Sequence, residues 1–342
     1  MKLGAMLGYW GAKPPADPIG TAKMAESLGY DSLWTAEAWG SDAFTPLAWM
    51  GAHTSTIKLG TGIVQMSART PTATAMAALS LDHLSGGRHI LGIGASGPQV
   101  VEGWYGQPYA KPLARTREYV SILRQVFARD AAVENPGPHY PLPYPGGTGL
   151  GKALKPITHP LRADLPIFLA AEGPKNVALS AEIADGWMPI YFAPSQDSFY
   201  RTALAEGFAR PGARHTLDTF EVACPVPVVP LDDVDAAVDF MRPMLALYIG
   251  GMGAREMNFH FEVFVRMGYG DEASKIQDAY LDGRKDEAAS YVTRQMIEEI
   301  CLVGPADKIR GELAKWQETV VSTFLIGGPP EILPLVAETL LG

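Results

Sequence analysis

Short apolar segments alternate with helical patterns along nearly the whole chain of 342 residues, and this alternation constrains the fold more than any other feature. The segment at residues 57–64 is apolar on both faces, which is typical of parallel strands covered on both sides. Eight such segments are predicted strands: Leu3–Tyr9, Asp31–Ala36, Ile57–Val64, Arg88–Gly94, Pro166–Ala171, Gly186–Ile190, Phe220–Val229 and Val320–Ile326. Eight alternations of strand and helix predict an α/β fold, a (β/α)8 TIM barrel, rather than an open sheet.

Helical patterns lie between the strands, most clearly at Thr72–Leu84, Leu113–Ala128 and Pro305–Glu318. The first of these is predicted to end at the glycine stop formed by residues 85–87. Two stretches do not fit the repeat. Residues 131–165 contain seven prolines and predict a long loop, and residues 232–304 predict three or four helices broken near residues 250–253, 268–270 and 283. We interpret both as insertions in a single barrel domain spanning residues 1–342.

Composition excludes several classes of function. Lys and Arg number 28 against 37 Asp and Glu, so the net charge is −9, and broad nucleic-acid binding, which needs a basic face, is not expected. No apolar run reaches the roughly 18 residues of a membrane span. Two cysteines, Cys224 and Cys301, make no disulfide framework and favour a reducing compartment, so we expect a cytoplasmic protein. No histidine or cysteine has metal-ligand spacing, so no metal site is expected.

In TIM barrels the functional groups lie at the C-terminal ends of the strands. After the fourth predicted strand comes the glycine-rich loop of residues 92–97, which suits either close approach to a ligand or a tight turn. After the fifth predicted strand, residues 171–176 lead into a helix. They predict either an anion site that includes Lys175 or an ordinary helix cap. Glycines 60 and 62 in the third strand indicate a bulge, a close ligand, or simply restricted packing.

Several segments together resemble the bacterial luciferase-like superfamily and, within it, the deazaflavin (coenzyme F420)-dependent oxidoreductases of actinobacterial type. They are Trp34–Gly40, Leu59–Val64, Leu84–Arg88 and Leu91–Trp104, and the likeness runs in order from the first strand to the last helix. The resemblance implies an insertion-bearing TIM barrel, usually a homodimer, that binds the deazaflavin at its C-terminal mouth.

The resemblance also implies a set of cofactor contacts. A non-prolyl cis peptide between Gly62 and Ile63 would back the deazaflavin ring, with Gln65 beside it and Glu37 at its polar edge. Two further loops would hold the rest of the cofactor. Ala95, Ser96, Gly97, Pro98 and Gln99 would contact its ribityl and phosphate side, and Ala171, Glu172, Gly173, Pro174 and Lys175 would hold the phosphate.

The chain departs from the sugar-phosphate dehydrogenase branch of the resembled family. That branch has a histidine where this sequence has Ala38, and a catalytic glutamate where it has Gly97. Sugar-phosphate oxidation is therefore not expected. We instead expect hydride transfer between the deazaflavin and a carbonyl, alcohol or activated alkene, with a small, apolar substrate.

Three side chains are candidates for handling a proton: Glu37, Asp42 and His260. Glu37 also suits a role as a hydrogen-bond acceptor for the cofactor, and His260 also suits a packed position on a helix of the second insertion. Two other functions stay open. One is a luciferase-like monooxygenase that uses flavin mononucleotide (FMN), and the other is a non-catalytic protein that binds the deazaflavin.

Overall fold

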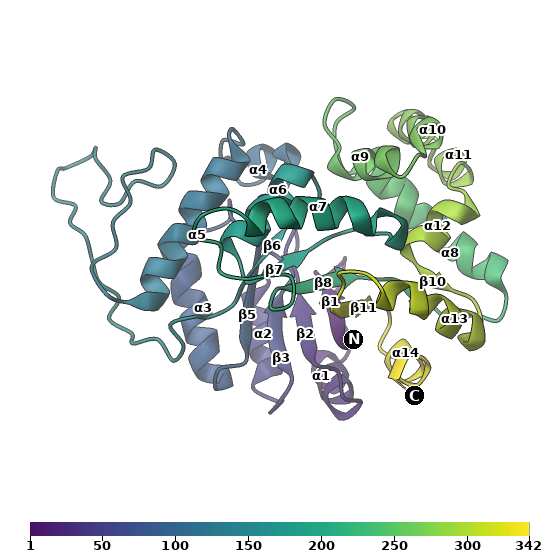
Figure 1. The fold of residues 1–342 in the computed structure, drawn as a ribbon, viewed down its shortest axis with the longest axis horizontal. Coiled ribbons are helices and arrows are strands. Elements are labelled where there is room, and N and C mark those ends of the chain that lie inside the picture. Colours follow the sequence, from purple (N-terminus) through teal and green to yellow (C-terminus); the bar gives the residue numbers. More distant parts are fainter. Residues whose placement is uncertain (342) are drawn as a thin grey trace.

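The computed structural model describes residues 1–341, which fold around a closed barrel of eight parallel strands (Figure 1). The strands are β1 (Lys2–Gly8), β2 (Ser32–Thr35), β3 (Lys58–Thr61) with its continuation β4 (Val64–Gln65), β5 (His89–Gly94), β6 (Ile167–Ala170), β7 (Gly186–Met188), β8 (Glu221–Pro225) and β11 (Thr323–Gly327). Neighbours pair in the order β3-β2-β1-β11-β8-β7-β6-β5, and pairing of β3 with β5 closes the barrel. The predicted (β/α)8 fold is confirmed.

Helices cover the outside of the barrel. They are α1 (Pro18–Ser27), α2 (Phe44–Gly51), α3 (Pro71–Ser85), α4 (Pro98–Gly103), α5 (Pro112–Ala128), α6 (Pro174–Ile183), α7 (Asp197–Phe208), α13 (Ala306–Gln317) and α14 (Ile332–Leu341), with the short 3-10 turn Pro194–Gln196 before α7. Helix α3 shows why the predicted bounds hold to within a residue or two. The Thr70 hydroxyl accepts from the Ala73 amide at its start, and Gly86, with φ of 68°, ends it.

Two predicted strands are interrupted. The segment predicted as Ile57–Val64 divides into β3 and β4 because Gly62 and Ile63 leave the ladder between them. The segment predicted as Phe220–Val229 divides into β8 and β9 (Val228–Val229). Pro227, which has no amide hydrogen to donate, lies between them. Strand β9 pairs with β10 (Leu302–Val303) in a separate two-stranded sheet.

The barrel interior is filled by large side chains opposite glycines. Trp34, Phe168 and Met188 are all buried there, and a Cβ atom built on Gly60 would lie 2.3 Å from the Trp34 ring. A Cβ atom on Gly92 would lie 1.9 Å from the carbonyl oxygen of Thr61 in the neighbouring strand. Restricted packing therefore accounts for both glycines, one of the alternatives that the sequence left open.

The two insertions lie on opposite sides of the barrel (Figure 1). Residues 131–165, all described, contain only an antiparallel bridge between Asn135 and Leu142 and otherwise run as loops. Residues 232–304 hold more helices than the predicted three or four: α8 (Val234–Ala246), the π-helical turn Leu247–Gly251, α9 (Phe259–Arg266), α10 (Gly270–Leu281), α11 (Lys285–Ser290) and α12 (Arg294–Ile300). These helices bury a hydrophobic cluster of their own. Three of the four breaks between them fall at the predicted glycines, and the break between α11 and α12 was not predicted.

Some apolar side chains stay on the surface of this single chain. Trp49 on α2, Met76 and Leu84 on α3, and Ile157 in the first insertion are each more than half exposed. The homodimer implied by the sequence stays a prediction, and such side chains are of the kind a partner covers. Across residues 1–341, no helix combines the length and the apolar character that crossing a membrane requires.

A buried carboxylate joins three elements at the N-terminal end of the barrel. Asp185, just before β7, accepts hydrogen bonds from the Ile167 amide (2.7 Å) and the Arg124 guanidinium (2.5 Å). Arg214 and His215 contact its other oxygen at 3.2 and 3.0 Å. Burial alone would raise the pKa of Asp185, but the Arg124 charge and these hydrogen bonds outweigh it and lower the pKa.

Replacing Asp185 with asparagine should remove about 3 kcal/mol from the free energy of unfolding at neutral pH, because Arg124 loses its buried partner. Because the pKa of Asp185 is lowered in the folded protein, this stabilisation also depends on pH. The stabilisation is fully present above the ordinary aspartate pKa and is lost as the pH falls through the folded-state value. Urea denaturation at a series of pH values should therefore show wild type and variant converging in acid. Asp164→Asn, at an exposed position, is the control, and a difference that stayed constant with pH would contradict the account.

Candidate active site at the barrel mouth

The loops that follow the strands contact one another at the C-terminal end of the barrel. The Trp10 amide after β1 donates to the Ser41 hydroxyl after β2 (3.0 Å), and the Tyr105 hydroxyl after α4 donates to the Ala38 carbonyl (3.2 Å). Exposed aromatic side chains stand on these same loops: Tyr9, Trp10, Trp39 and Trp104. The mouth therefore has an aromatic rim, which suits a planar or apolar ligand.

The peptide bond between Gly62 and Ile63 is cis, as the resemblance predicted. It lies between β3 and β4, where the Gly62 amide donates to the Thr35 carbonyl (2.7 Å) and the Ile63 carbonyl accepts from the Glu37 amide (3.2 Å). A Cβ atom at Gly62 would lie 2.8 Å from the terminal methyl group of Met188, so a side chain there would have to displace that methyl group. Both residues are partly exposed, so this backbone faces the mouth.

Glu37 is 6% exposed, and its carboxylate is fully occupied. One oxygen accepts from the Gln65 amide (2.8 Å) and from Arg69 (2.7 Å), and the other accepts from the Ala43 amide (3.2 Å) and from Arg69 (2.9 Å). Burial alone would lower the pKa of Arg69, but the bond to Glu37 outweighs it and the pKa is raised. Asp42 lies 3.9 Å from the same guanidinium and also accepts from the Thr45 amide at the start of α2.

The predicted residues after β4 and β5 lie close to the cis peptide. The side-chain Nε2 of Gln65 donates to the Glu37 carbonyl (3.2 Å), while the buried Oε1 of the same side chain has no hydrogen-bond partner among the described residues. Ala95, Ser96, Gly97 and Pro98 are partly exposed, and Gln99 is exposed. Ser96 has a left-handed φ of 59°, which turns the chain sharply into the six-residue helix α4.

The predicted phosphate loop, residues 171–175, leads into α6. The Ala171 carbonyl accepts from the Trp187 indole (2.8 Å), Gly173 is the N-cap, and Pro174 occupies the first helical position. Lys175 is exposed and lines a groove between α5, α6 and α7 that also contains Arg117 and Arg210. Both arginines pair with the one carboxylate of Glu182, and Glu206 also lines the groove, so Lys175 lies among charges of both signs.

His260 and Glu172 form a second ionisable cluster at the mouth. The His260 Nδ1 lies 3.2 Å from a Glu172 oxygen, a distance that suits an ion pair although the two atoms are not aligned for a hydrogen bond. Neither atom has another hydrogen-bond partner within residues 1–341, and both are buried. The His260 ring stands edge-on to Tyr191 and Tyr248, with ring centroids 5.7 and 5.1 Å apart. Burial raises the pKa of both tyrosines.

The structure therefore divides the three candidate proton-handling residues between two networks. Glu37 and Asp42 share Arg69, whereas His260 joins Glu172, which the sequence had placed only in the phosphate loop. Sequence reasoning missed Arg69 as the partner of Glu37, and it missed the tyrosines around His260. Within residues 1–341, no group of three His, Cys, Asp or Glu side chains is arranged to hold a metal ion.

Comparison with known proteins agrees with this architecture. The model of the family described as “Luciferase-like monooxygenase” matches residues 2–323. The chain belongs to this family. It is 55% identical to the “Putative coenzyme F420-dependent oxidoreductase” of Mycobacterium tuberculosis over 98% of each chain. It is also 28% identical to the 5,10-methylenetetrahydromethanopterin reductase of Archaeoglobus fulgidus, over 90% of this chain and 88% of that one.

A solved structure shows the same fold. The coenzyme F420-dependent tetrahydromethanopterin reductase of Methanopyrus kandleri superposes with a TM-score of 0.82 at 24% identity, covering 99% of this chain and 98% of that one. The predicted luciferase-like family and barrel are confirmed, and the chain is an enzyme of that family.

Replacing Glu37 with glutamine should cost about 3 kcal/mol of unfolding free energy, because the Arg69 charge loses its buried partner and an amide would face several N–H donors. Asp42→Asn is the matched control. Its carboxylate is 40% exposed and lies 3.9 Å from Arg69, so that change should cost less than about 1 kcal/mol. Urea denaturation of both variants measures the contrast. Equal decreases in the unfolding free energy of the two variants would show that the Glu37 contacts stabilise the fold no more than the Asp42 contacts do.

Proposed function

We propose that this protein is a coenzyme F420-dependent oxidoreductase that transfers a hydride between the deazaflavin and a carbonyl, alcohol or activated alkene. The observation that carries the proposal is the 55% identity, over 98% of both chains, to the mycobacterial relative named for that activity. Identity of that extent spans the barrel, both insertions and every loop at the mouth. An FMN-dependent monooxygenase of the same family is the alternative.

The residues at the mouth fit a bound deazaflavin. The cis peptide at Gly62 and Ile63 would back the ring, and the unpartnered Oε1 of Gln65 would take a donor from it. Two loops that end in helix N-termini would hold the polar chain of the cofactor. They are residues 95–99 before and at the start of α4, and residues 171–175 before and at the start of α6, where Lys175 adds a positive charge.

Bound deazaflavin supplies or accepts the hydride, and the protein has to orient the substrate, exclude water and hold one proton. His260 is the group we assign to the proton. Glu172 beside Nδ1 would fix the orientation of the ring, which leaves Nε2 for the substrate. Tyr191 and Tyr248 pack against the ring and keep water from it.

Glu37 is a weaker candidate for the proton because both of its oxygens already accept two hydrogen bonds. Its carboxylate instead ties the backbone of Gln65, next to the cis peptide, to Ala43 before α2. We therefore propose that Glu37 is a positioning residue for the ring site, with Asp42 assisting through Arg69. The aromatic rim at Trp10, Trp39 and Trp104 supports an apolar substrate.

Cofactor choice is the first test of the proposal. Fluorescence titration of the purified protein should give tighter binding of coenzyme F420 than of FMN, because two helix N-termini and Lys175 are available for the acidic chain of the deazaflavin. Tighter FMN binding would instead favour the monooxygenase. Reduced F420 that binds but is not reoxidised by any member of a carbonyl and alkene library would favour the non-catalytic binding protein.

The role of His260 is a separate prediction. His260→Gln should lower kcat about a hundredfold and change the dissociation constant of F420 less than twofold, because the ring handles a proton and does not anchor the cofactor. Glu172→Gln should lower kcat less than His260→Gln does, because the ring keeps its contacts with Tyr191 and Tyr248 and loses only the carboxylate beside Nδ1.

His159→Gln, at an exposed position in the first insertion, is the matched control and should leave kcat unchanged. If His260 is only a packed helix residue, its replacement will alter thermal stability while kcat stays within about twofold of the wild-type value.

A further inference from the structure

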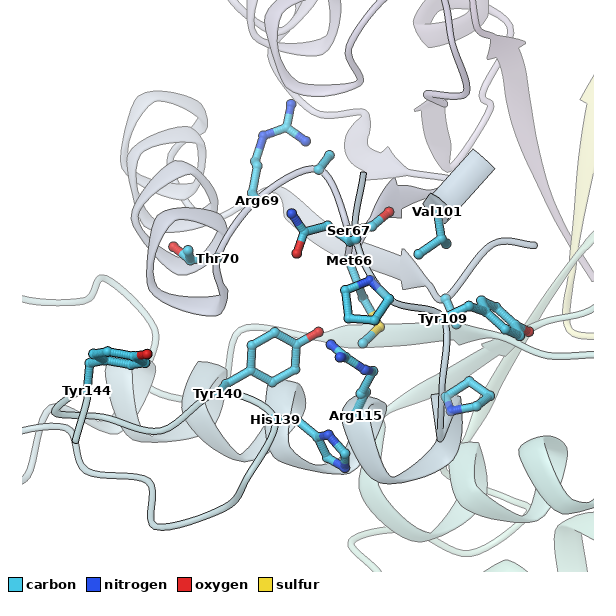
Figure 2. A pocket seen from close by; sticks show the side chains of 15 residues that line it. Met66, Ser67, Arg69, Thr70, Val101, Tyr109, Arg115, His139, Tyr140 and Tyr144 are labelled. Atoms are coloured by element: carbon cyan, nitrogen blue, oxygen red, sulfur yellow. The ribbon is translucent and has the colours of Figure 1, made fainter. Parts of the chain in front are cut away.

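A second cavity adjoins the mouth on the side away from helices α8–α12. Its volume is about 770 Å³, within the range of small-molecule sites, and Figure 2 shows the side chains that line it. One wall is the loop after β4, residues 66–70, and another is the segment that leads into α5. The third wall comes from the first insertion, through His139, Tyr140 and Tyr144. Ala95, one of the predicted cofactor contacts, also borders this cavity.

The wall from the insertion is fixed by a carboxylate. One oxygen of Glu118 on α5 accepts from the backbone amides of His139 (3.0 Å) and Tyr140 (3.1 Å) and from the Asn135 side chain (3.1 Å). A Cβ atom on Gly137 would lie 2.3 Å from this carboxyl group, so the loop approaches as closely as a glycine allows. The cavity is therefore preformed rather than a gap between loose loops.

Arg115 is the positive charge of this cavity that no carboxylate neutralises. Its Nε donates to the Ala110 carbonyl (3.0 Å), and within residues 1–341 it makes no ion pair. Its guanidinium lies over the Tyr140 ring, 5.7 Å from the centroid, and the Tyr140 hydroxyl points toward it (Figure 2). Arg69, in contrast, is paired with Glu37 and points away from Arg115 in the same view.

The remaining lining is mixed, with apolar side chains, the polar Thr70 and Gln107, and one unsatisfied hydroxyl. Met66 and Val101 are buried side chains at the cavity, and Pro108 and Tyr109 also line it, from the segment before α5. The Ser67 hydroxyl lines the cavity, is buried, and has no hydrogen-bond partner among the described residues. A buried hydroxyl without a partner is uncommon in a folded protein, and a ligand oxygen would satisfy it.

We propose that this cavity binds an amphipathic carboxylate, whose charged end pairs with Arg115 and the Tyr140 hydroxyl and whose apolar body lies against Met66 and Val101. A planar guanidinium recognises a carboxylate through two parallel N–H donors, which a neutral alcohol cannot match. The carboxylate has two possible sources. It belongs either to a free acid with an apolar chain or to the glutamate tail of the proposed deazaflavin cofactor.

Isothermal titration with decanoate as the probe tests the shared chemistry without any cofactor. We expect decanoate to bind at least tenfold more tightly than decanol, and Arg115→Met to weaken decanoate binding at least tenfold. Tyr140→Phe should weaken it about threefold. Arg117→Met is the matched control, because it removes one positive charge from the same helix, where Arg117 faces Glu182, and it should not change decanoate binding.

A second arm distinguishes the sources. Coenzyme F420 with a long glutamate tail and the same deazaflavin without a tail are titrated into wild type and Arg115→Met. If the tail is the natural occupant, only the long-tailed form should lose affinity in the variant, and if a free acid is the occupant, neither form should.

The proposal is overturned if decanoate binds wild type and Arg115→Met equally and tail length has no effect on either. Binding of the tail-less deazaflavin would survive that outcome, so failure here is distinguishable from failure of the proposed function. Arg115→Lys keeps the positive charge but loses the two parallel N–H donors of the guanidinium. It replaces Arg115→Met as the test variant if the methionine variant does not fold. It should bind decanoate with intermediate affinity.

Discussion

Closure of the barrel depends on two strand positions that have no side chain. Gly60 and Gly92 leave space for Trp34 and for the backbone of Thr61, so β3 can pair with β2 on one side and β5 on the other. A methyl group at either position would push β3 out of the ring, because the interior is packed at the density of a solid and has no void to absorb it. Closure in turn brings eight strand ends, and the loops after them, to one mouth.

The two acidic clusters at that mouth differ in how completely their hydrogen-bonding atoms are satisfied. Every lone-pair direction that Glu37 offers is used by an amide or by Arg69, so its carboxylate holds structure in place. Glu172 and His260 are buried yet lack aligned partners for the atoms that face each other. Buried polar groups are nearly always satisfied in folded proteins, and those that are not concentrate at sites that act on a ligand. The Gln65 Oε1 and the Ser67 hydroxyl are also buried without a hydrogen-bond partner among the described residues. Gln65 borders the ring site, and Ser67 borders the second cavity.

The sequence was informative where structure is local. Periodicity located eight strands, and glycines marked three of the four breaks between the helices of residues 232–304, because both depend on neighbours a few residues apart. The cis peptide came from family resemblance, since no local pattern distinguishes it from an ordinary bulge. The pairs Glu37–Arg69 and Glu172–His260 depend on how distant loops meet at the mouth. Nothing in the spacing of those residues predicts the contacts, and an acidic residue that is already matched looks the same in sequence as one that is free.

The distribution of charge explains how an acidic chain can offer sites for acidic ligands. Near the candidate sites Arg69 pairs with Glu37, and Arg117 and Arg210 share the one carboxylate of Glu182. Arg266 donates to the Glu172 carbonyl and has no ion pair among the described residues. A net charge of −9 spread over the surface acts weakly at a given point, because salt screens exposed charges beyond a Debye length of about 8 Å. A single unmatched guanidinium in a partly enclosed cavity acts at contact distance and is screened much less. Local matching, rather than the total charge, therefore decides where an anion is held, and Arg115 is an unmatched guanidinium that lines a cavity.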